Sequence, residues 1–171
     1  MIFKLLEKKQ IQEFKRLMIE AFQYGYESYT KKKEEQVLAE CDIDKSLNNK
    51  NAYAYVMVEG EKILGGLIVN IDNEEKMGFL DFIFVRVDCE SKGIGQKMWK
   101  EIEQRYPNII KWQTCTPYFD RRNIHFYVNK LKFKIVEYYN RYHKDPNEPS
   151  INDDEFFEDD GGMFEFEKII K

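Results

Sequence analysis

The chain has 171 residues, of which 43% are apolar and 15% aromatic, and this suits one domain over residues 1–171 with a core of its own. Its net charge of −4 and its pI near 5.4 argue against a nucleic acid partner, which would require a basic face. The apolar runs are too short to span a bilayer and the N-terminus lacks the regions of a secretory signal, so we expect a cytoplasmic protein without a membrane partner.

The first part of the chain carries both helix and strand patterns. Ile11, Phe14, Met18 and Phe22 recur at helical spacing, which predicts an amphipathic helix. The other expected elements are a strand at 3–6, a helix at 30–47 that turns Val37 and Leu38 toward the core, and a hairpin of strands at 53–59 and 63–71.

The middle of the chain passes from a strand through a glycine turn into a helix. Residues 78–87 are almost uninterruptedly apolar, as expected of a central strand that is covered on both faces. The helix that follows begins near Gly93 and Gly95 and is ended by Pro107. Glycines allow left-handed backbone angles and a close ligand approach, and a helix start presents N–H groups without helical acceptors. This segment therefore predicts an anion site, with a pyrophosphate as the favoured ligand.

The last part of the chain is predicted to hold one more helix among strands. Its expected elements are a strand at 109–116, a helix with Ile124, Tyr127, Val128 and Leu131 on one face, and strands at 133–142 and 163–170 joined by an acidic loop at about 144–161. Residues 152–160 of that loop carry six carboxylates around Phe156 and Phe157. Such a run is typical of a solvated loop, and the alternative is an acidic rim for a cationic amine or a partner, with calcium binding a remote third option.

Two familiar phosphate-binding patterns do not fit the glycine turn. A P-loop requires a hydroxyl residue after its lysine, and here Gly95 is followed by Gln96, Lys97 and Met98. A dinucleotide-binding fold requires a small residue where Met98 stands and normally places its cradle at the first strand of the domain. The first interpretation fails and the second is weak.

The strand, the Gly93-x-Gly95 turn and the helix resemble the acyl-coenzyme A site of the GNAT superfamily of N-acetyltransferases, whose pattern is Arg/Gln-x-x-Gly-x-Gly/Ala. A second block, Asn123-Ile-His-Phe-Tyr-Val-Asn-Lys-Leu-Lys-Phe133, is similar to the family's later segment, and residues 54–69 are similar to its hairpin. The resemblance spans roughly residues 1–139 and is strongest over 79–133. Two positions depart from the pattern: Glu90 stands where the family usually has Arg or Gln, and Lys132 where it usually has Gly.

The resemblance implies an α/β (α+β) fold, with a central mixed, mostly antiparallel twisted sheet of about six to seven strands flanked by about four helices. It also implies an N-acetyltransferase that uses acetyl-CoA and no metal, and that acetylates a primary amine of a small molecule or peptide in a ternary complex. The edges of the final strand pair leave a homodimer open. Two other functions stay open: a non-catalytic acyl-CoA-binding or regulatory domain, and an interaction module built on the acidic loop.

The resemblance also assigns cofactor-binding residues. The peptide groups of Phe84 and Val85 would pair with the pantetheine arm, and Asn123 would either cap its helix or bond the pantetheine. The pyrophosphate would be held by the main-chain N–H groups of Ser91, Lys92, Gly93, Ile94, Gly95 and Gln96.

Two residues are the candidate catalysts. Tyr127 matches the family tyrosine that lies near the coenzyme A sulfur and can protonate the thiolate; the alternative is that, on a helical face, it only fills core space. Asp81 matches an acidic position from which relatives deprotonate the amine through water; otherwise it faces solvent or pairs with a cation, and a bulge in its strand would decide its direction. His125 and His143 are alternatives, each more typical of a structural histidine.

The three cysteines suit a cytoplasmic protein without a metal role. Cys41, Cys89 and Cys115 are an odd number and include no Cys-x-x-Cys pair, so we expect reduced thiols. Neither Cys89 nor Cys115 has an obvious base near it in the sequence, which favours direct transfer over a covalent intermediate.

Overall fold

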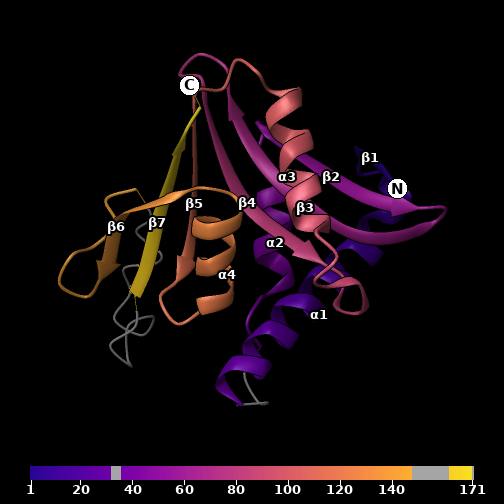
Figure 1. The fold of residues 1–171 in the computed structure, drawn as a ribbon, viewed down its shortest axis with the longest axis horizontal. Helices are drawn as coiled ribbons and strands as arrows, with labels where there is room; N and C mark the ends of the chain where they lie inside the picture. The colour runs from indigo at the N-terminus through magenta and orange to yellow at the C-terminus, as the bar shows by residue number, and fades with distance from the viewer. Residues whose placement is uncertain (32–35, 148–161, 171) are drawn as a thin grey trace. The chain divides into compact units, whose positions relative to one another are not determined.

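The computed structural model describes residues 1–31, 36–147 and 162–170 (Figure 1). The chain divides into two compact units, Met1–Ile110 and Lys111–Lys171. Within the described residues there are seven strands and four α-helices, and the strand pairs inside each unit are antiparallel. These findings confirm the expected mostly antiparallel α/β architecture. A single folding domain over the whole chain stays a prediction.

The first unit contains four strands in the order of the sequence. They are β1 (Ile2–Leu5), β2 (Ala52–Glu59), β3 (Lys62–Asp72) and β4 (Met77–Val85), and each pairs with the next. These strands form at the apolar runs for which the sequence predicts strands. The predicted boundaries differ from the observed ones by one or two residues.

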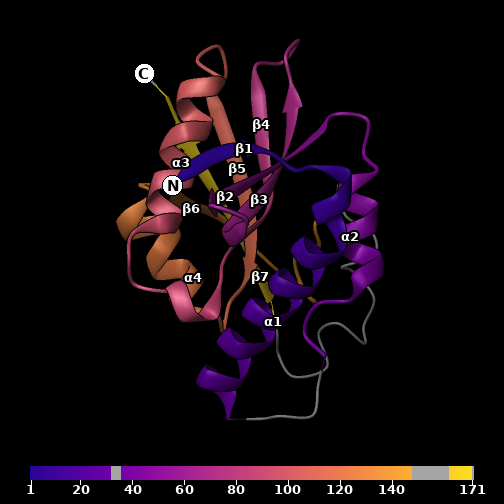
Figure 2. The same ribbon diagram turned by 90° about the vertical axis from the view of Figure 1, so that its right-hand side faces the viewer.

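Three helices cover the two faces of these strands. They are α1 (Ile11–Thr30), α2 (Glu40–Leu47) and α3 (Ile94–Arg105). Figure 2 shows α3 on one side of β2, β3 and β4, and α1 and α2 on the other side. Phe14, Met18 and Ile43 from α1 and α2 pack with Ile68 and Phe84 of the strands in one buried cluster.

Two adjacent glycines in β3 allow helices to approach both faces. A Cβ atom on Gly65 would lie 2.6 Å from the carbonyl oxygen of Phe84 and 3.1 Å from the terminal methyl of Met98 in α3. A Cβ atom on Gly66 would lie 2.5 Å from the ring of Phe14 in α1. Because successive residues of a strand point to opposite faces, this pair leaves room for α3 on one side and α1 on the other.

The helix expected at residues 30–47 is wrong at Lys31 and at residues 36–39, and residues 32–35 lie outside the described residues. Lys31 has a φ of 58°, and this left-handed residue caps α1 by donating its N–H to the carbonyl of Glu27. The next described helix begins at Glu40, so Val37 and Leu38 precede it; Leu38 is buried, but Val37 is exposed. Helical spacing is weak in this charged segment, and the sequence offered no proline or glycine to mark the break.

The second unit contains three strands and one short helix. The strands β5 (Lys111–Pro117), β6 (Lys134–Asn140) and β7 (Gly162–Ile169) lie in the order β5-β7-β6. The helix α4 (Arg121–His125) continues directly into a π-helical turn, Phe126–Lys130. Neither α4 nor any helix of the first unit, among the residues described, is long and apolar enough to cross a membrane.

The π-helical turn changes the face that the sequence predicted. The N–H of Leu131 donates to the carbonyl of Phe126 at 3.0 Å, a spacing of five residues instead of four. Tyr127 and Leu131 are buried as expected, whereas Ile124 and Val128 are only half-buried. An extra residue in the turn breaks the i, i+3, i+4 repeat, so the expected uniform apolar face is wrong.

Candidate functional site

The segment between β4 and α3 is the one for which the sequence predicts an anion cradle. After a 3-10 turn, Val87–Cys89, the backbone takes left-handed angles at Ser91, with φ 61°, and at Gly93, with φ 73°. A Cβ atom on Gly93 would meet no atom within 4 Å. The protein therefore leaves open space over Gly93, at the start of α3.

At the start of α3, several backbone N–H groups have no acceptor within the helix. The first bond of the helix is donated by the N–H of Lys97 to the carbonyl of Gly93, at 3.0 Å. The N–H groups of Ile94, Gly95 and Gln96 precede this bond, and Gly93 caps the helix with no side chain. A row of such donors at the positive end of a helix fits a diphosphate.

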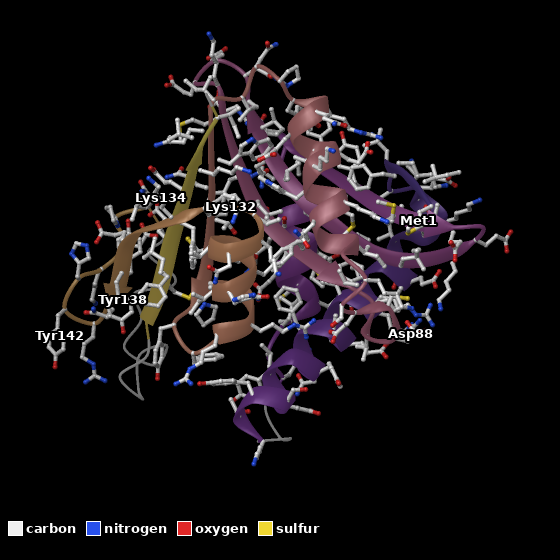
Figure 3. All side chains as sticks on the ribbon, viewed as in Figure 1. Met1, Asp88, Lys132, Lys134, Tyr138 and Tyr142 are labelled. Carbon is white, nitrogen blue, oxygen red and sulfur yellow. The ribbon has the colours of Figure 1, made fainter. Side chains whose placement is uncertain are left out.

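Charged side chains beside this cradle form ion pairs. Asp88, labelled in Figure 3, forms ion pairs with Lys62 at 2.9 Å and with Arg86 at 2.8 Å. The hydrogen bond from Lys62 is the main reason that the pKa of Asp88 is lowered to about 2, and the Cys89 thiol and Arg86 act in the same direction. Lys92 is exposed and donates to the backbone carbonyl of Asp88 at 3.5 Å.

At the end of β4, the backbone polar groups of Phe84 and Val85 point to opposite edges of the strand. The N–H of Arg86 donates to the carbonyl of Leu64 in β3 at 2.9 Å, and Phe84 and Val85 lie opposite Gly66 and Gly65. Because antiparallel strands alternate the direction of their polar groups, Phe84 faces β3 like Arg86, and Val85 points its N–H and C=O to the other edge of β4. Of the two, Val85 is the residue placed to pair with an extended ligand.

A β-bulge in β4 determines where Asp81 points. Val69 and Ile68 are adjacent in β3, yet they pair with Leu80 and Phe82, so Asp81 is the extra residue. The ring of Phe82 meets Phe22 of α1, with centroids 6.0 Å apart. The bulge therefore turns both Asp81 and Phe82 toward the face that α1 and α2 cover. Sequence analysis identified this bulge as the feature that would decide the direction of Asp81.

The Asp81 carboxylate is held by two neutral side chains. The Ser46 hydroxyl of α2 donates to Asp81 Oδ2, and the Asn70 Nδ2 of β3 donates to the same oxygen at 2.6 Å. Neither Ser46 nor Asn70 was expected from the sequence. Their signal was weak, because they lie 35 and 11 residues away from Asp81.

Tyr127 lies in the core of the second unit. Its side chain is 5% exposed, and its ring centroid is 6.0 Å from that of Phe133 and 5.4 Å from that of Phe166. Burial raises the pKa of Tyr127 well above its ordinary value, and a hydrogen bond with Thr114 opposes that rise. The phenol therefore keeps its proton at neutral pH, and its ring fills core space.

One prediction for Asn123, that its side chain caps its own helix, is wrong. The cap is Asp120, whose carboxylate accepts from the backbone N–H of Asn123 at 2.9 Å and from its Nδ2 at 2.7 Å. The spacing Asp-x-x-Asn was the available signal, because an aspartate accepts from the N–H three residues later. A role for Asn123 toward pantetheine stays a prediction.

The remaining candidates have local partners. His125 contacts Asn129 at 2.9 Å, and His143 lies 3.1 Å from Glu137 and stacks on Tyr139. Cys89 is buried, and burial raises the pKa of its thiol, which disfavours a nucleophilic thiolate. The acidic run at residues 152–160 lies outside the described residues.

Comparison with known proteins now adds to these observations. The sequence pattern of the Acetyltransferase (GNAT) family matches residues 11–133. A Bacillus subtilis protein, the uncharacterised YrkN, is 35% identical over 99% of this chain and 94% of its own.

Solved structures share the fold. The smu.2055 protein of Streptococcus mutans superposes with a TM-score of 0.72 at 14% identity, over the full length of both chains. The PaiA N-acetyltransferase of Thermoplasma acidophilum, solved with coenzyme A, gives a TM-score of 0.66 at 15% identity, over 99% of this chain and 98% of that one. With the cradle and the bulged strand in place, the chain belongs to the GNAT family of acetyltransferases.

Proposed function

We propose that this protein transfers an acetyl group from acetyl-CoA to a primary amine of a small molecule or peptide, directly and without a covalent enzyme intermediate. The observation that carries the proposal is the open, left-handed Gly93 at the start of α3. A fold neighbour, the PaiA protein, is an N-acetyltransferase solved with coenzyme A, which supports the same donor and acceptor classes here.

The cradle would hold the donor by its diphosphate. The N–H groups of residues 91–96 would bind the phosphate oxygens, and the peptide groups of Val85 would pair with the pantetheine arm. Together these contacts would orient the thioester beside β4. Orientation of two reactants is a large part of the catalysis of such transfers.

The transfer itself requires three proton movements. Asp81 would take a proton from the acceptor ammonium, directly or through water, which frees the nitrogen lone pair to attack the thioester carbonyl carbon. A carbon–nitrogen bond then forms, the nitrogen gives up its second proton to water, and the carbon–sulfur bond breaks. Tyr127, protonated at neutral pH, would give its proton to the departing thiolate sulfur and recover one from solvent.

Two observations favour a second function. Tyr127 packs against Phe133 and Phe166 in a core, and Glu90 places a carboxylate by the cradle where the family usually has Arg or Gln. A domain that binds an acyl-CoA without turning it over would show the same two features. Binding without turnover is therefore the result that would distinguish this alternative.

The first experiment is a calorimetric titration of the protein with acetyl-CoA. Wild type is expected to bind in the micromolar range, and a Gly93→Asp variant is expected to lose binding because a carboxylate would enter the cradle. Gly60→Asp is the matched control: Gly60 has a φ of 60° and open space around it, but lies in the turn between β2 and β3. No binding by wild type, or equal loss in both variants, would contradict the proposal.

The second experiment measures release of the coenzyme A thiol with a panel of primary amines. Asp81→Asn and Tyr127→Phe are each expected to lower the rate about a hundredfold or more, as is usual when an acid or base is removed. Both variants should still bind acetyl-CoA. Binding without thiol release by wild type would instead favour the non-catalytic alternative.

A further inference from the structure

The environment of Asp81 contains one polar atom without a partner. Asn70 uses its Nδ2 to donate to Asp81, and its Oδ1 is buried with no hydrogen-bond donor among the residues that the structure describes. A buried carbonyl oxygen without a donor is unfavourable, and native proteins usually satisfy it. The amide cannot simply turn over, because its oxygen would then face the Asp81 carboxylate.

We propose that Ser46 and Asn70 position Asp81 for the acceptor, and that Asn70 Oδ1 accepts an N–H from the acceptor's primary ammonium group. The proposal rests on the proposed function and specifies the acceptor side of its site. An ammonium carries three N–H donors, so one group can reach both the Asp81 carboxylate and the Asn70 oxygen.

The three side chains come from three different elements, which fixes the carboxylate in direction. Ser46 belongs to α2, Asn70 to β3, and Asp81 to the bulge of β4. Ser46 is itself 8% exposed, so its hydroxyl has little access to water and is committed to Asp81. A carboxylate fixed by two donors on one oxygen presents a constant direction to an incoming amine.

The position of α2, and with it of Ser46, is set by a buried lysine of α1. Lys15 is 6% exposed, and its ammonium lies 2.6 Å from Glu40 and 2.8 Å from Asp44 of α2. The two acidic partners, Asp44 and Glu40, precede Ser46 on the same short helix, within about two helical turns of it. Ser46 therefore acts on Asp81 from a helix that is anchored independently of the acceptor.

Steady-state kinetics test the positioning role. Ser46→Ala is expected to lower kcat about tenfold with little change in the KM for acetyl-CoA, since it releases one hydrogen bond to a charged group. Asn70→Ala is expected to lower kcat and to raise the KM for the amine. Ser46→Thr keeps the hydroxyl and should recover most of the rate, and Asn73→Ala, an exposed residue of the β3–β4 turn, should be unaffected.

Nuclear magnetic resonance tests the binding role without any turnover. Addition of n-butylammonium chloride should shift the side-chain amide resonances of Asn70 in wild type, and much less in Asp81→Asn. Tetramethylammonium chloride, which has no N–H, is the control and should leave these resonances unchanged.

The outcomes separate the two proposals. If wild type acetylates amines but Ser46→Ala and Asn70→Ala match its kcat and KM values, the positioning role is wrong. If n-butylammonium does not move the Asn70 resonances, the ammonium contact is wrong. If wild type binds acetyl-CoA, acetylates no amine of the panel and yet shows the Asn70 shift, the acceptor site stands while the proposed transfer fails.

Discussion

Two turns of this protein share nearly the same left-handed φ angle at one position but carry different residues there. Gly93, before α3, has a φ of 73°, and Lys132, before β6, has a φ of 68°. In the GNAT pattern both positions usually carry glycine, and here only the first does. Lys132, labelled in Figure 3, is exposed, and its ammonium donates a hydrogen bond to the carbonyl of Asn129 at 2.9 Å.

The difference between the two turns distinguishes two reasons for a glycine at such a position: backbone strain, and space for a ligand. A left-handed residue with a side chain is strained by roughly 1–2 kcal/mol, and at Lys132 the fold tolerates that strain. At Gly93 the protein offers room for a Cβ atom, since none of its own atoms would lie within 4 Å. Strain and space inside the protein therefore do not explain why the first position keeps glycine. Under the proposed function, a ligand in the open space would explain it.

The largest expected effect is on the affinity of the cradle. Gly93→Ala adds only a methyl group, and we expect it to weaken acetyl-CoA binding by on the order of a hundredfold, because the methyl takes the space of the diphosphate. Unfolding in urea should show a loss of about 1 kcal/mol from the left-handed angle. Gly60→Ala should lose similar stability and no affinity. Equal acetyl-CoA affinity of Gly93→Ala and wild type would contradict the idea that Gly93 leaves space for the diphosphate.

The sequence predicted the cradle well because its signal is local. Gly93 and Gly95 follow an apolar strand and open a helix, and all three features lie within a few residues of one another. The same holds for β4, whose apolar run marks it as a buried strand. What the sequence could not predict is set by the register between strands.

The surroundings of Asp81 and Tyr127 depend on such non-local geometry. The bulge that turns Asp81 is a one-residue shift against β3, and Ser46 reaches it from a helix far away in the chain. The turn at Tyr127 inserts one residue into a helix, which no spacing rule anticipates. The resemblance to the GNAT pattern identified both candidates, and only the fold gives their partners.

The next effect concerns the stability of the second turn. Lys132→Gly is expected to raise the free energy of unfolding by about 1 kcal/mol, because glycine relieves the left-handed strain. Acetyl-CoA affinity should not change. Lys130→Gly, in the π-helical turn nearby, is the control and should destabilise, since glycine there only loosens a helical residue. Destabilisation by Lys132→Gly would show that its bond to Asn129 outweighs the strain.

A smaller effect is expected from the charge beside the cradle. Glu90→Gln should tighten acetyl-CoA binding about threefold at low salt, because a carboxylate near a diphosphate repels it across water. The gain should shrink at about 0.5 M salt, where charges are screened over a shorter distance. Glu74→Gln, in the β3–β4 turn, should have no effect at either salt concentration. A salt-independent gain would mean that Glu90 acts by shape and not by charge.

The smallest effect tests how the segment before Gly93 is held. Lys62 first, and then Cys89 and Arg86, lower the pKa of Asp88 from 3.8 to about 2. Since its pKa is lower in the folded state, Asp88 stabilises the protein at pH values above 3.8, and this contribution is lost as the pH falls toward 2.

The melting temperature should therefore be lower in Asp88→Asn than in wild type at pH 6, and the two should converge near pH 2. Lys62→Gln should reduce the difference at pH 6, because it removes the main cause of the lowered pKa. A difference that stays constant from pH 6 to pH 2 would show that the asparagine disturbs the turn by its shape, and that the loop before the cradle does not depend on these ion pairs. In that case Gly93 would owe its position to the backbone of the loop alone.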